Sequence, residues 1–406
     1  MEREFLKDIS SAVTLNVTGG RIDSFRQQDE TTGTVRVYDQ GCIGVAGCLG
    51  EPDEAALTKK AIEALELQIP YPCNLEGALE QSDLHEEEII PVPELIPTMQ
   101  SFLDRLGESC PRFAFTGKIR LNYGKSEYRN SLGRHLISSG RNAAVELTVQ
   151  NRGSGNLYDT VMCYTGNHFD PEAVLRQFKA QYDAYYNNVE LEPGRYPVVM
   201  EPSDLLGTFF PHFLGEMYVS GASLISGKLG EKIFSDKLTF QDDMNSATTP
   251  GVSFFDTEGC VAPNLRPTLV QNGVLTGLLT TKKSAEQFGL PNLGTAAAAY
   301  DGVPGFGYHR CYLEPTAGSL KELVPGKAIY VVVASGGDTT PDGHFATPVQ
   351  MACLLEDGKL VGRLPELNIG GDFYDMLGKD YLGAVNGDLV KEDGLLCAVQ
   401  MDVEQA

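Results

Sequence analysis

Two carboxylates and a glycine lie close together in the segment FFDTEGC, and this is the first place where the sequence could support chemistry. Asp256 and Glu258 are separated by one residue, and Gly259 lets the chain reverse beside them. Buried carboxylates at such a spacing can bind a substrate or exchange protons. The same spacing in an arbitrary loop is typical of a solvated acidic turn, and spacing alone favours that interpretation. Asp256, Glu258 and Gly259 are kept as candidate substrate-binding residues.

A second candidate site lies in the segment PHFLGEM. His212 and Glu216 are four residues apart, which would place them on one face of a helix as half of a metal site. Pro211 disturbs the same turn, and two ligands do not hold zinc. His309, in the segment GYHRC, has no second ligand at a usable spacing. His212, Glu216 and His309 are therefore weak candidate ligands, and no metal is expected in this chain.

Other catalytic signatures do not match the sequence. Ser335 follows the predicted strand 329–333, but its segment SGGD is not a G-x-S-x-G nucleophile elbow. The chain has no GxxxxGK[ST] phosphate loop. Its nine cysteines are odd in number and include no CxxC pair, which indicates free thiols in a reducing compartment. No catalytic residue can be assigned from these patterns.

Composition limits the class of partner. The 406 residues include 32 basic and 55 acidic side chains, giving a net charge of −23. Sequence-independent binding to DNA or to anionic membranes needs clustered Lys and Arg, so neither is expected. No apolar run approaches the roughly 20 residues of a membrane span, and the first residues do not form a signal peptide. A soluble, cytoplasmic protein of two or three domains is predicted.

The N-terminal half alternates between strand and helix patterns. Residues 1–97 are predicted to form an α+β domain, with strands from 13 to 47 and a helix that begins at Asp53. Within it, residues 68–97 contain five prolines and an acidic run at 86–88, which predicts a linker without regular structure. Residues 98–193 form a middle α+β region that ends in a helix capped by Asp170.

The C-terminal half has the signature of β-hairpins. Asn272-Gly273 and Asp357-Gly358 each separate two apolar runs, as two-residue hairpin turns do. A large, mostly antiparallel β-rich domain is therefore predicted over residues 194–406. The fold class is α+β, with N-terminal α/β hairpin-helix units followed by this domain.

The same half resembles a known family. The segments GEKIFSD, FDTEGC and SAEQFG are similar to the C-terminal domain of the TldD/PmbA peptidase family, whose members have also been labelled modulators of DNA gyrase. YHRCYLEPTAGSLKELV (residues 308–324) and GGDFYDMLGKD (residues 370–380) look closer to its PmbA, or TldE-like, branch. The resemblance implies a barrel-like C-terminal domain that encloses a cavity on dimerisation.

The resemblance also indicates where zinc ligands would lie. TldD-type members carry a His-Glu-x-x-x-His motif and a distal cysteine in Met-Cys-Gly-Lys-Asp. If His212 takes the first position, Phe213 stands in place of the glutamate and Met217 in place of the second histidine. Leu377 stands in place of the cysteine. Phe, Met and Leu can neither activate a metal-bound water nor supply the thiolate.

The leading hypothesis is a TldE/PmbA-like subunit that is catalytically silent alone. The resemblance implies a TldD-type partner that carries the zinc, or a second copy of this chain, and an unfolded peptide as the substrate for proteolysis or maturation. One alternative is a self-sufficient metallopeptidase with rearranged ligands such as His212, Glu216 and His309. The other is a non-enzymatic, homodimeric peptide-binding or regulatory protein. Whether this chain is itself an enzyme stays open.

Overall fold

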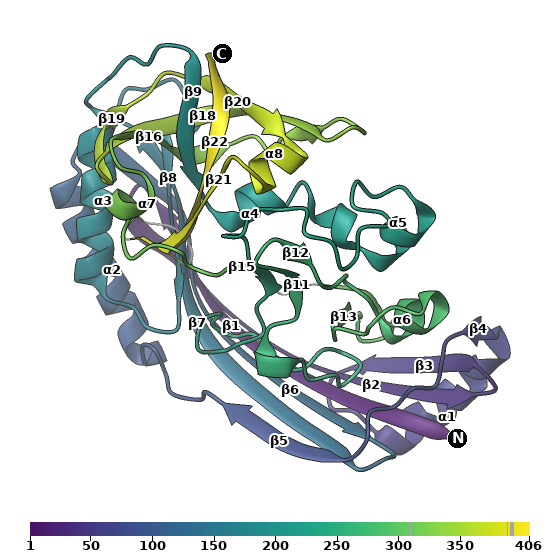
Figure 1. The fold of residues 1–406 in the computed structure, drawn as a ribbon. Helices are drawn as coiled ribbons and strands as arrows, with labels where there is room; N and C mark the ends of the chain where they lie inside the picture. Colours follow the sequence, from purple (N-terminus) through teal and green to yellow (C-terminus); the bar gives the residue numbers. More distant parts are fainter. Residues whose placement is uncertain (308–309, 388, 390–393) are drawn as a thin grey trace.

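A long, curved sheet built from residues 2–166 supports the rest of the molecule in the computed structural model (Figure 1). The structure describes residues 1–307, 310–387, 389 and 394–406. The sheet has eight strands in the order β4-β3-β2-β1-β6-β7-β5, with β8 also paired to β7. Its strands are β1 (Glu2–Thr18), β2 (Arg21–Asp39), β3 (Cys42–Leu49), β4 (Ile69–Pro70), β5 (Leu79–Leu84), β6 (Phe113–Asn130), β7 (Arg134–Asn151) and β8 (Thr160–Gly166).

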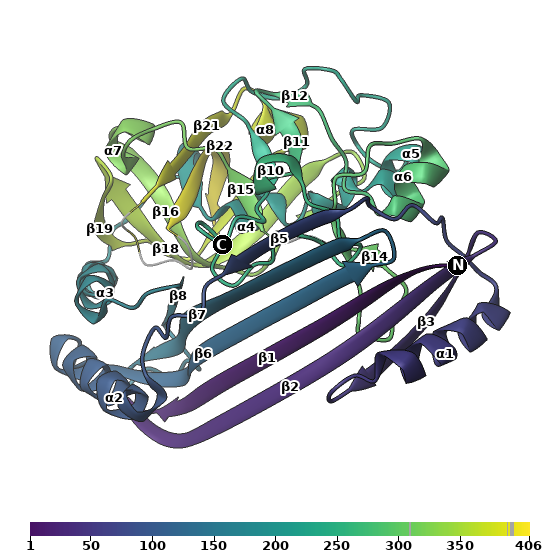
Figure 2. The same ribbon diagram turned by 90° about the horizontal axis from the view of Figure 1, so that it is seen from below.

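Buried and exposed side chains alternate along the strands, so the two faces of the sheet differ. Val145, Leu147 and Val149 of β7 are buried while Glu146 and Thr148 are exposed, which confirms the predicted period of two. The convex face packs against helices α1 (Glu54–Ala64) and α2 (Val92–Ser109), and α3 (Pro171–Tyr185) extends the same core. The concave face points toward the C-terminal half of the chain (Figure 1). Figure 2 shows β2, β1, β6, β7 and β5 side by side in the long sheet.

Residues 68–97 contain more regular structure than the prolines predicted. β5 pairs in parallel with β7 over Leu79 to Leu84, and α2 begins at Val92 with Pro93 in its first turn. Pro97 lies inside α2. Proline is tolerated in a first helical turn, and burial of Leu95 and Met99 holds the following turns in place. The expectation that this segment lacks regular structure was wrong because tertiary packing outweighed local propensity.

The C-terminal half is organised around a closed barrel of five strands. β9 (Gly194–Met200), β16 (Lys327–Ala334), β18 (His344–Glu356), β20 (Leu367–Asp372) and β22 (Leu395–Gln405) form the ring. Every pairing in the ring is antiparallel except β16 with β9. The predicted barrel-like, mostly antiparallel domain is confirmed, and closure removes the exposed edges that an open sheet would leave.

Shorter elements attach to the barrel. Three short strands pair with strands of the barrel: β17 (Asp338–Thr339), β19 (Lys359–Arg363) and β21 (Tyr381–Asn386). A separate four-stranded sheet consists of β10 (Phe240–Asp242), β11 (Thr268–Gln271), β12 (Val274–Leu275) and β15 (Cys311–Leu313). A two-stranded sheet consists of β13 (Ala296–Ala297) and β14 (Gly305–Phe306). The helices are α4 (Pro202–Leu206), α5 (Gly215–Ser220), α6 (Lys282–Phe288), α7 (Leu320–Leu323) and α8 (Phe373–Leu377), with 3₁₀ turns η1 (Leu65–Leu67), η2 (Phe210–Phe213) and η3 (Pro263–Leu265).

Both predicted hairpin turns form. Asn272 and Gly273 have φ angles of 48° and 81° between β11 and β12, and Asp357 and Gly358 have φ angles of 50° and 75° between β18 and β19. Two successive positive φ angles define the turn type that matches strand twist. Within the described part of the chain, no helix combines the length and apolar character that crossing a bilayer requires.

Candidate functional site

The acidic segment predicted from the sequence lies in a buried junction between the sheet and the C-terminal half. Asp256 is 2% exposed and Glu258 is 0% exposed, so the interpretation as a solvated acidic turn is wrong. The segment packs on the concave face, where Leu6, Tyr128 and Leu136 form one cluster with the neighbouring Phe254 and Phe255. Burial removes these carboxylates from water, and each therefore needs donors from the protein.

Asp256 holds the chain reversal together. Its Oδ1 accepts hydrogen bonds from the backbone N–H groups of Glu258 and Cys260, both at 2.9 Å, and its Oδ2 accepts one from Ala296 at 3.0 Å. Burial raises the pKa of Asp256 above its usual range, and these backbone donors work against the rise. Gly259 has a φ of +70°, and an added Cβ would lie 2.3 Å from the ring of Tyr128. Only glycine fits at this position.

Glu258 links the loop to two other parts of the chain. Its Oε1 accepts a hydrogen bond from the hydroxyl of Tyr71 at 2.5 Å, and its Oε2 accepts one from the backbone N–H of Lys282 at 2.9 Å. The ammonium group of Lys282 donates to the carbonyl of Glu258 at 2.9 Å. Burial, followed by the adjacent Asp256 carboxylate, raises the pKa of Glu258 to about 7.

A buried ion pair on the sheet completes the junction. Arg36 lies 3.4 Å from the carboxylate of Glu4 and donates to the carbonyl of Thr257 at 2.5 Å. Tyr38 and Tyr128 donate to the two oxygens of the same Glu4 carboxylate at 2.9 and 2.8 Å. Sequence analysis missed these residues. Arg36 lies between Val35 and Val37, which is a weak signal of a buried charge, but Glu4 lies among other charged residues and gives no such signal.

An open cavity of about 450 Å³ borders this junction. Lys282 and Glu286 of α6 line one side, and Asn74 and Glu76 line the other. The carboxylate oxygens of Asp256 and Glu258 are occupied by protein donors, which gives both residues a structural role at the junction. Direct contact of Asp256, Glu258 or Gly259 with a substrate stays a prediction.

The structure separates His212 from Glu216. His212 lies in the 3₁₀ turn η2, and the extended Leu214, with φ −72° and ψ 132°, separates this turn from α5, which contains Glu216. The expectation that the two side chains share a helix face was wrong because Leu214 is extended. Nδ1 of His212 accepts a hydrogen bond from the N–H of Leu224 at 3.2 Å, and burial lowers the pKa of the imidazole. His309 lies outside the described residues.

Two segments that are distant in sequence meet beside His212. Its ring lies 5.7 Å from that of Phe373 in α8, the helix that ends at Leu377. Phe213 and Leu377 are both fully buried in the same hydrophobic core. Among residues 1–307, 310–387, 389 and 394–406, no group of three or more His, Cys, Asp or Glu side chains is arranged to hold a metal ion.

Known proteins share this architecture. Residues 193–393 match the model of the PmbA/TldA metallopeptidase C-terminal domain. A metalloprotease of Methanothermobacter thermautotrophicus is 31% identical over 192 residues, which cover 45% of this chain and 41% of that protein. A zinc metalloprotease TldD homolog of Saccharolobus solfataricus is 24% identical over 274 residues, which cover 63% of this chain and 61% of that protein.

The similarity to a solved structure extends over the whole chain. The crystal structure of TldE from Thermococcus kodakarensis superposes with a TM-score of 0.81 at 19% identity, covering 100% of this chain and 97% of that one. By contrast, the sequence match spans less than two thirds of the length of either metalloprotease. The matched domain and the shared fold lead to one conclusion: this chain belongs to the TldD/PmbA family.

Proposed function

We propose that this chain is a TldE/PmbA-like subunit of a TldD-type zinc metallopeptidase complex and is catalytically silent by itself. The observation that carries the proposal is the burial of Phe213, at the position where the resemblance places the catalytic glutamate. Phe213 is 0% exposed, and its ring lies 5.2 Å from that of Phe240. A zinc peptidase needs a carboxylate there to take a proton from the metal-bound water. A core phenylalanine cannot do this.

The residues at the other ligand positions support the same proposal. Leu377, where the family cysteine would lie, is 0% exposed and packs among hydrocarbon side chains. Met217 offers only a thioether, which is not among the ligands that zinc sites use. His212 already accepts a backbone hydrogen bond through Nδ1. This donor set does not fit zinc, whose structural and catalytic sites take at least three His, Cys or carboxylate ligands.

The proposed role is to help a partner enclose an unfolded peptide during its proteolysis or maturation. The partner would be a TldD-type subunit that carries the zinc, or a second copy of this chain. Peptide recognition through backbone hydrogen bonds needs an open strand edge. The strands of the closed barrel are paired on both sides, so open edges in the C-terminal half belong to short strands such as β12, β17 and β19. Recognition there would tolerate many peptide sequences.

Metal content and peptidase activity of the purified chain test the silent role. We expect no stoichiometric zinc and no cleavage of an unstructured peptide. Cleavage by the lone chain that requires zinc and disappears in His212→Ala, but persists in His135→Ala, would overturn the proposal. His135 is a suitable control because it lies on β7 of the long sheet, whereas His212 lies in the turn η2 of the C-terminal half.

Affinity purification from the native cell tests the partner. Recovery of a second protein that bears His-Glu-x-x-x-His supports the heteromeric complex, and mixing the two purified chains should restore zinc-dependent cleavage. Recovery of a homodimer alone, with no peptidase partner, would instead favour a binding or regulatory protein.

A further inference from the structure

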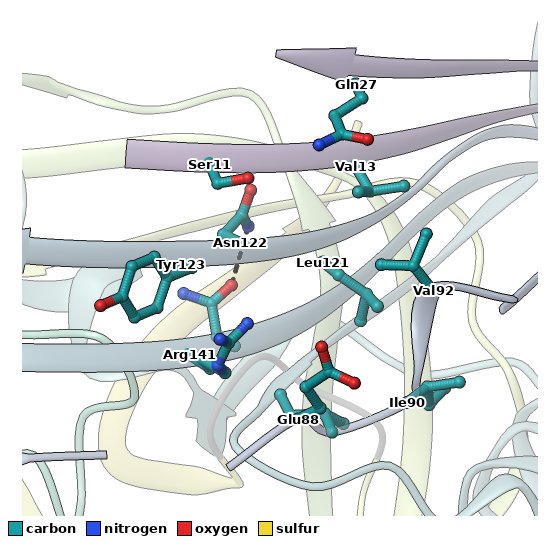
Figure 3. A pocket seen from close by; sticks show the side chains of 12 residues that line it. Ser11, Val13, Gln27, Glu88, Ile90, Val92, Leu121, Asn122, Tyr123 and Arg141 are labelled. Carbon is teal, nitrogen blue, oxygen red and sulfur yellow. Dashed lines mark hydrogen bonds between the residues drawn. The ribbon is translucent and has the colours of Figure 1, made fainter. Parts of the chain in front are cut away.

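A second pocket, of about 260 Å³, is lined by side chains of the long sheet (Figure 3). It lies on the opposite face from the junction, because Val13 in the pocket and Leu6 at the junction are an odd number of residues apart on β1. Its floor is formed by β1, β6 and β7, and the segment that leads into α2 forms a wall. Its volume is below the roughly 300 Å³ at which pockets begin to accept drug-sized ligands. The pocket therefore suits a small metabolite.

One end of the pocket is apolar. Val13 and Leu121 lie opposite each other on β1 and β6, and Ile90 and Val92 approach them from the wall segment. Val13 and Ile90 are buried, but Val92 is 40% exposed. Val92 and the half-buried Leu121 leave apolar surface in contact with solvent, and a branched aliphatic group of a ligand would cover it.

The other end carries two opposite charges. The guanidinium of Arg141 lies 4.5 Å from the ring centroid of Tyr123, and its Nε donates to the carbonyl of Glu86 at 3.1 Å. These contacts fix the orientation of Arg141 and leave its terminal nitrogens available. Figure 3 shows the Glu88 carboxylate reaching up between Arg141 and Ile90. Within the part of the chain that the structure describes, neither Arg141 nor Glu88 forms an ion pair.

We propose that this pocket binds one free α-amino acid with a branched aliphatic side chain. The ligand carboxylate would accept hydrogen bonds from Arg141, its ammonium group would donate to Glu88, and its side chain would cover Leu121 and Val92. An unpaired cation and an unpaired anion beside an apolar surface match the three parts of such a zwitterion. The proposal is independent of the peptidase complex, because the pocket belongs to one chain and lies away from the junction.

Calorimetric titration of the full chain with L-leucine tests the proposal. We expect saturable binding of one leucine per chain. Leucinamide lacks the carboxylate and 4-methylpentanoate lacks the ammonium group, and each should bind at least about tenfold more weakly, the effect of losing one charge-assisted contact. Glycine, which has no side chain, should produce no measurable binding.

Single substitutions test whether the charges of Arg141 and Glu88 contribute to leucine binding. Arg141→Gln and Glu88→Gln should each weaken leucine binding at least about tenfold, since each removes one charged contact. Glu87→Gln is the matched control because Glu87 is exposed in the same segment and does not line this pocket. Its affinity for leucine should equal that of the unaltered chain.

Three results would overturn the proposal: no saturable binding of leucine, binding of 4-methylpentanoate as tight as that of leucine, or unchanged affinity in Arg141→Gln. The ligand series uses the unaltered chain, so it remains decisive if a variant fails to fold. Failure to recover a peptidase partner in the purification experiment would not affect the outcome of the leucine titration.

Discussion

At the scale of single residues, burial of the acidic motif in the junction raises the pKa of Glu258, so this side chain can bind a proton in the folded chain. Glu258 lies beside a second carboxylate, Asp256, in a site closed to water. The hydroxyl of Tyr71 and the backbone of Lys282 bind its two oxygens, but burial and Asp256 still favour the protonated form. The stability of the chain should therefore depend on the proton at Glu258.

Glu258→Gln tests this dependence on pH. The pKa of Glu258 is about 7 in the folded chain and 4.5 in the absence of perturbation, so between these values the folded state binds more protons. The stabilisation from Glu258 is complete below the lower value and is lost as the pH rises through the upper one. Over that range the free energy of unfolding should fall by up to about 3 kcal/mol more in the natural chain than in Glu258→Gln.

Chemical denaturation at several pH values measures this difference. Glu286→Gln removes an exposed carboxylate on the nearby helix α6 and should retain the pH dependence of the natural chain. Parallel stability profiles for the natural chain and Glu258→Gln would contradict the prediction.

Gly259→Ala tests the close approach of the motif to the sheet. The positive φ should cost about 1–2 kcal/mol for any L-residue, and the contact with Tyr128 should add about 1–3 kcal/mol. Gly50→Ala is the matched control, because Gly50 has a φ of +91° and an added Cβ there meets nothing within 4 Å. Equal losses of unfolding free energy in the two variants would show that the Tyr128 contact contributes nothing.

At the scale of elements, helix α2 forms despite two prolines because its buried face packs on the sheet. Leu95, Met99 and Phe102 are at most 1% exposed and lie in the same core as the β1 side chains. Pro97 is exposed and lies beyond the first turn, where its missing N–H removes one helical hydrogen bond. Packing therefore stabilises a helix that local propensity opposes.

Pro97→Ala should raise the free energy of unfolding by about 1–3 kcal/mol, because it restores the backbone hydrogen bond and relieves the contact of the ring with the preceding turn. Pro93→Ala is the control, since Pro93 occupies the first turn, where no helical hydrogen bond is lost. It should leave stability unchanged or slightly reduced. Urea denaturation measures both, and a loss of stability in Pro97→Ala would contradict the prediction.

At the scale of the whole molecule, polar contacts join the sheet to the C-terminal half. Arg36 is 1% exposed and contacts both Glu4 on β1 and the carbonyl of Thr257. Residues more than 200 positions apart therefore share one buried network. Breaking a buried ion pair is costly because the remaining charge stays buried without its counterion.

Arg36→Met should lower the free energy of unfolding by about 3–5 kcal/mol, since it leaves the Glu4 carboxylate buried without its cation. The double variant Glu4→Gln/Arg36→Met should lose less than the sum of the two single variants, because neither charge is then left alone. Thermal and urea denaturation of all four proteins completes the cycle. Additive losses would show that the two side chains do not interact.

The local chemistry of the chain could be read correctly from the sequence. Alternation in β7, the Asp170 cap of α3 and the two-residue turn at Asn272-Gly273 depend on neighbouring residues, so the sequence pattern predicts them. The family, too, was recognisable from motifs such as FDTEGC. Each of these features is encoded within a short stretch.

Tertiary structure alone decided the roles that depend on distant segments. No local pattern shows that Glu4, Arg36 and Tyr71 lie beside Glu258, because strand pairing and docking of the two halves bring them together. The same contacts bury the loop that contains Asp256 and Glu258, which its residue spacing predicted to be solvated. Packing also allows the proline-rich segment 68–97 to form the strand β5 and the start of helix α2. Burial is a property of the assembled chain, and it determines whether a carboxylate is a solvated turn residue or part of a junction.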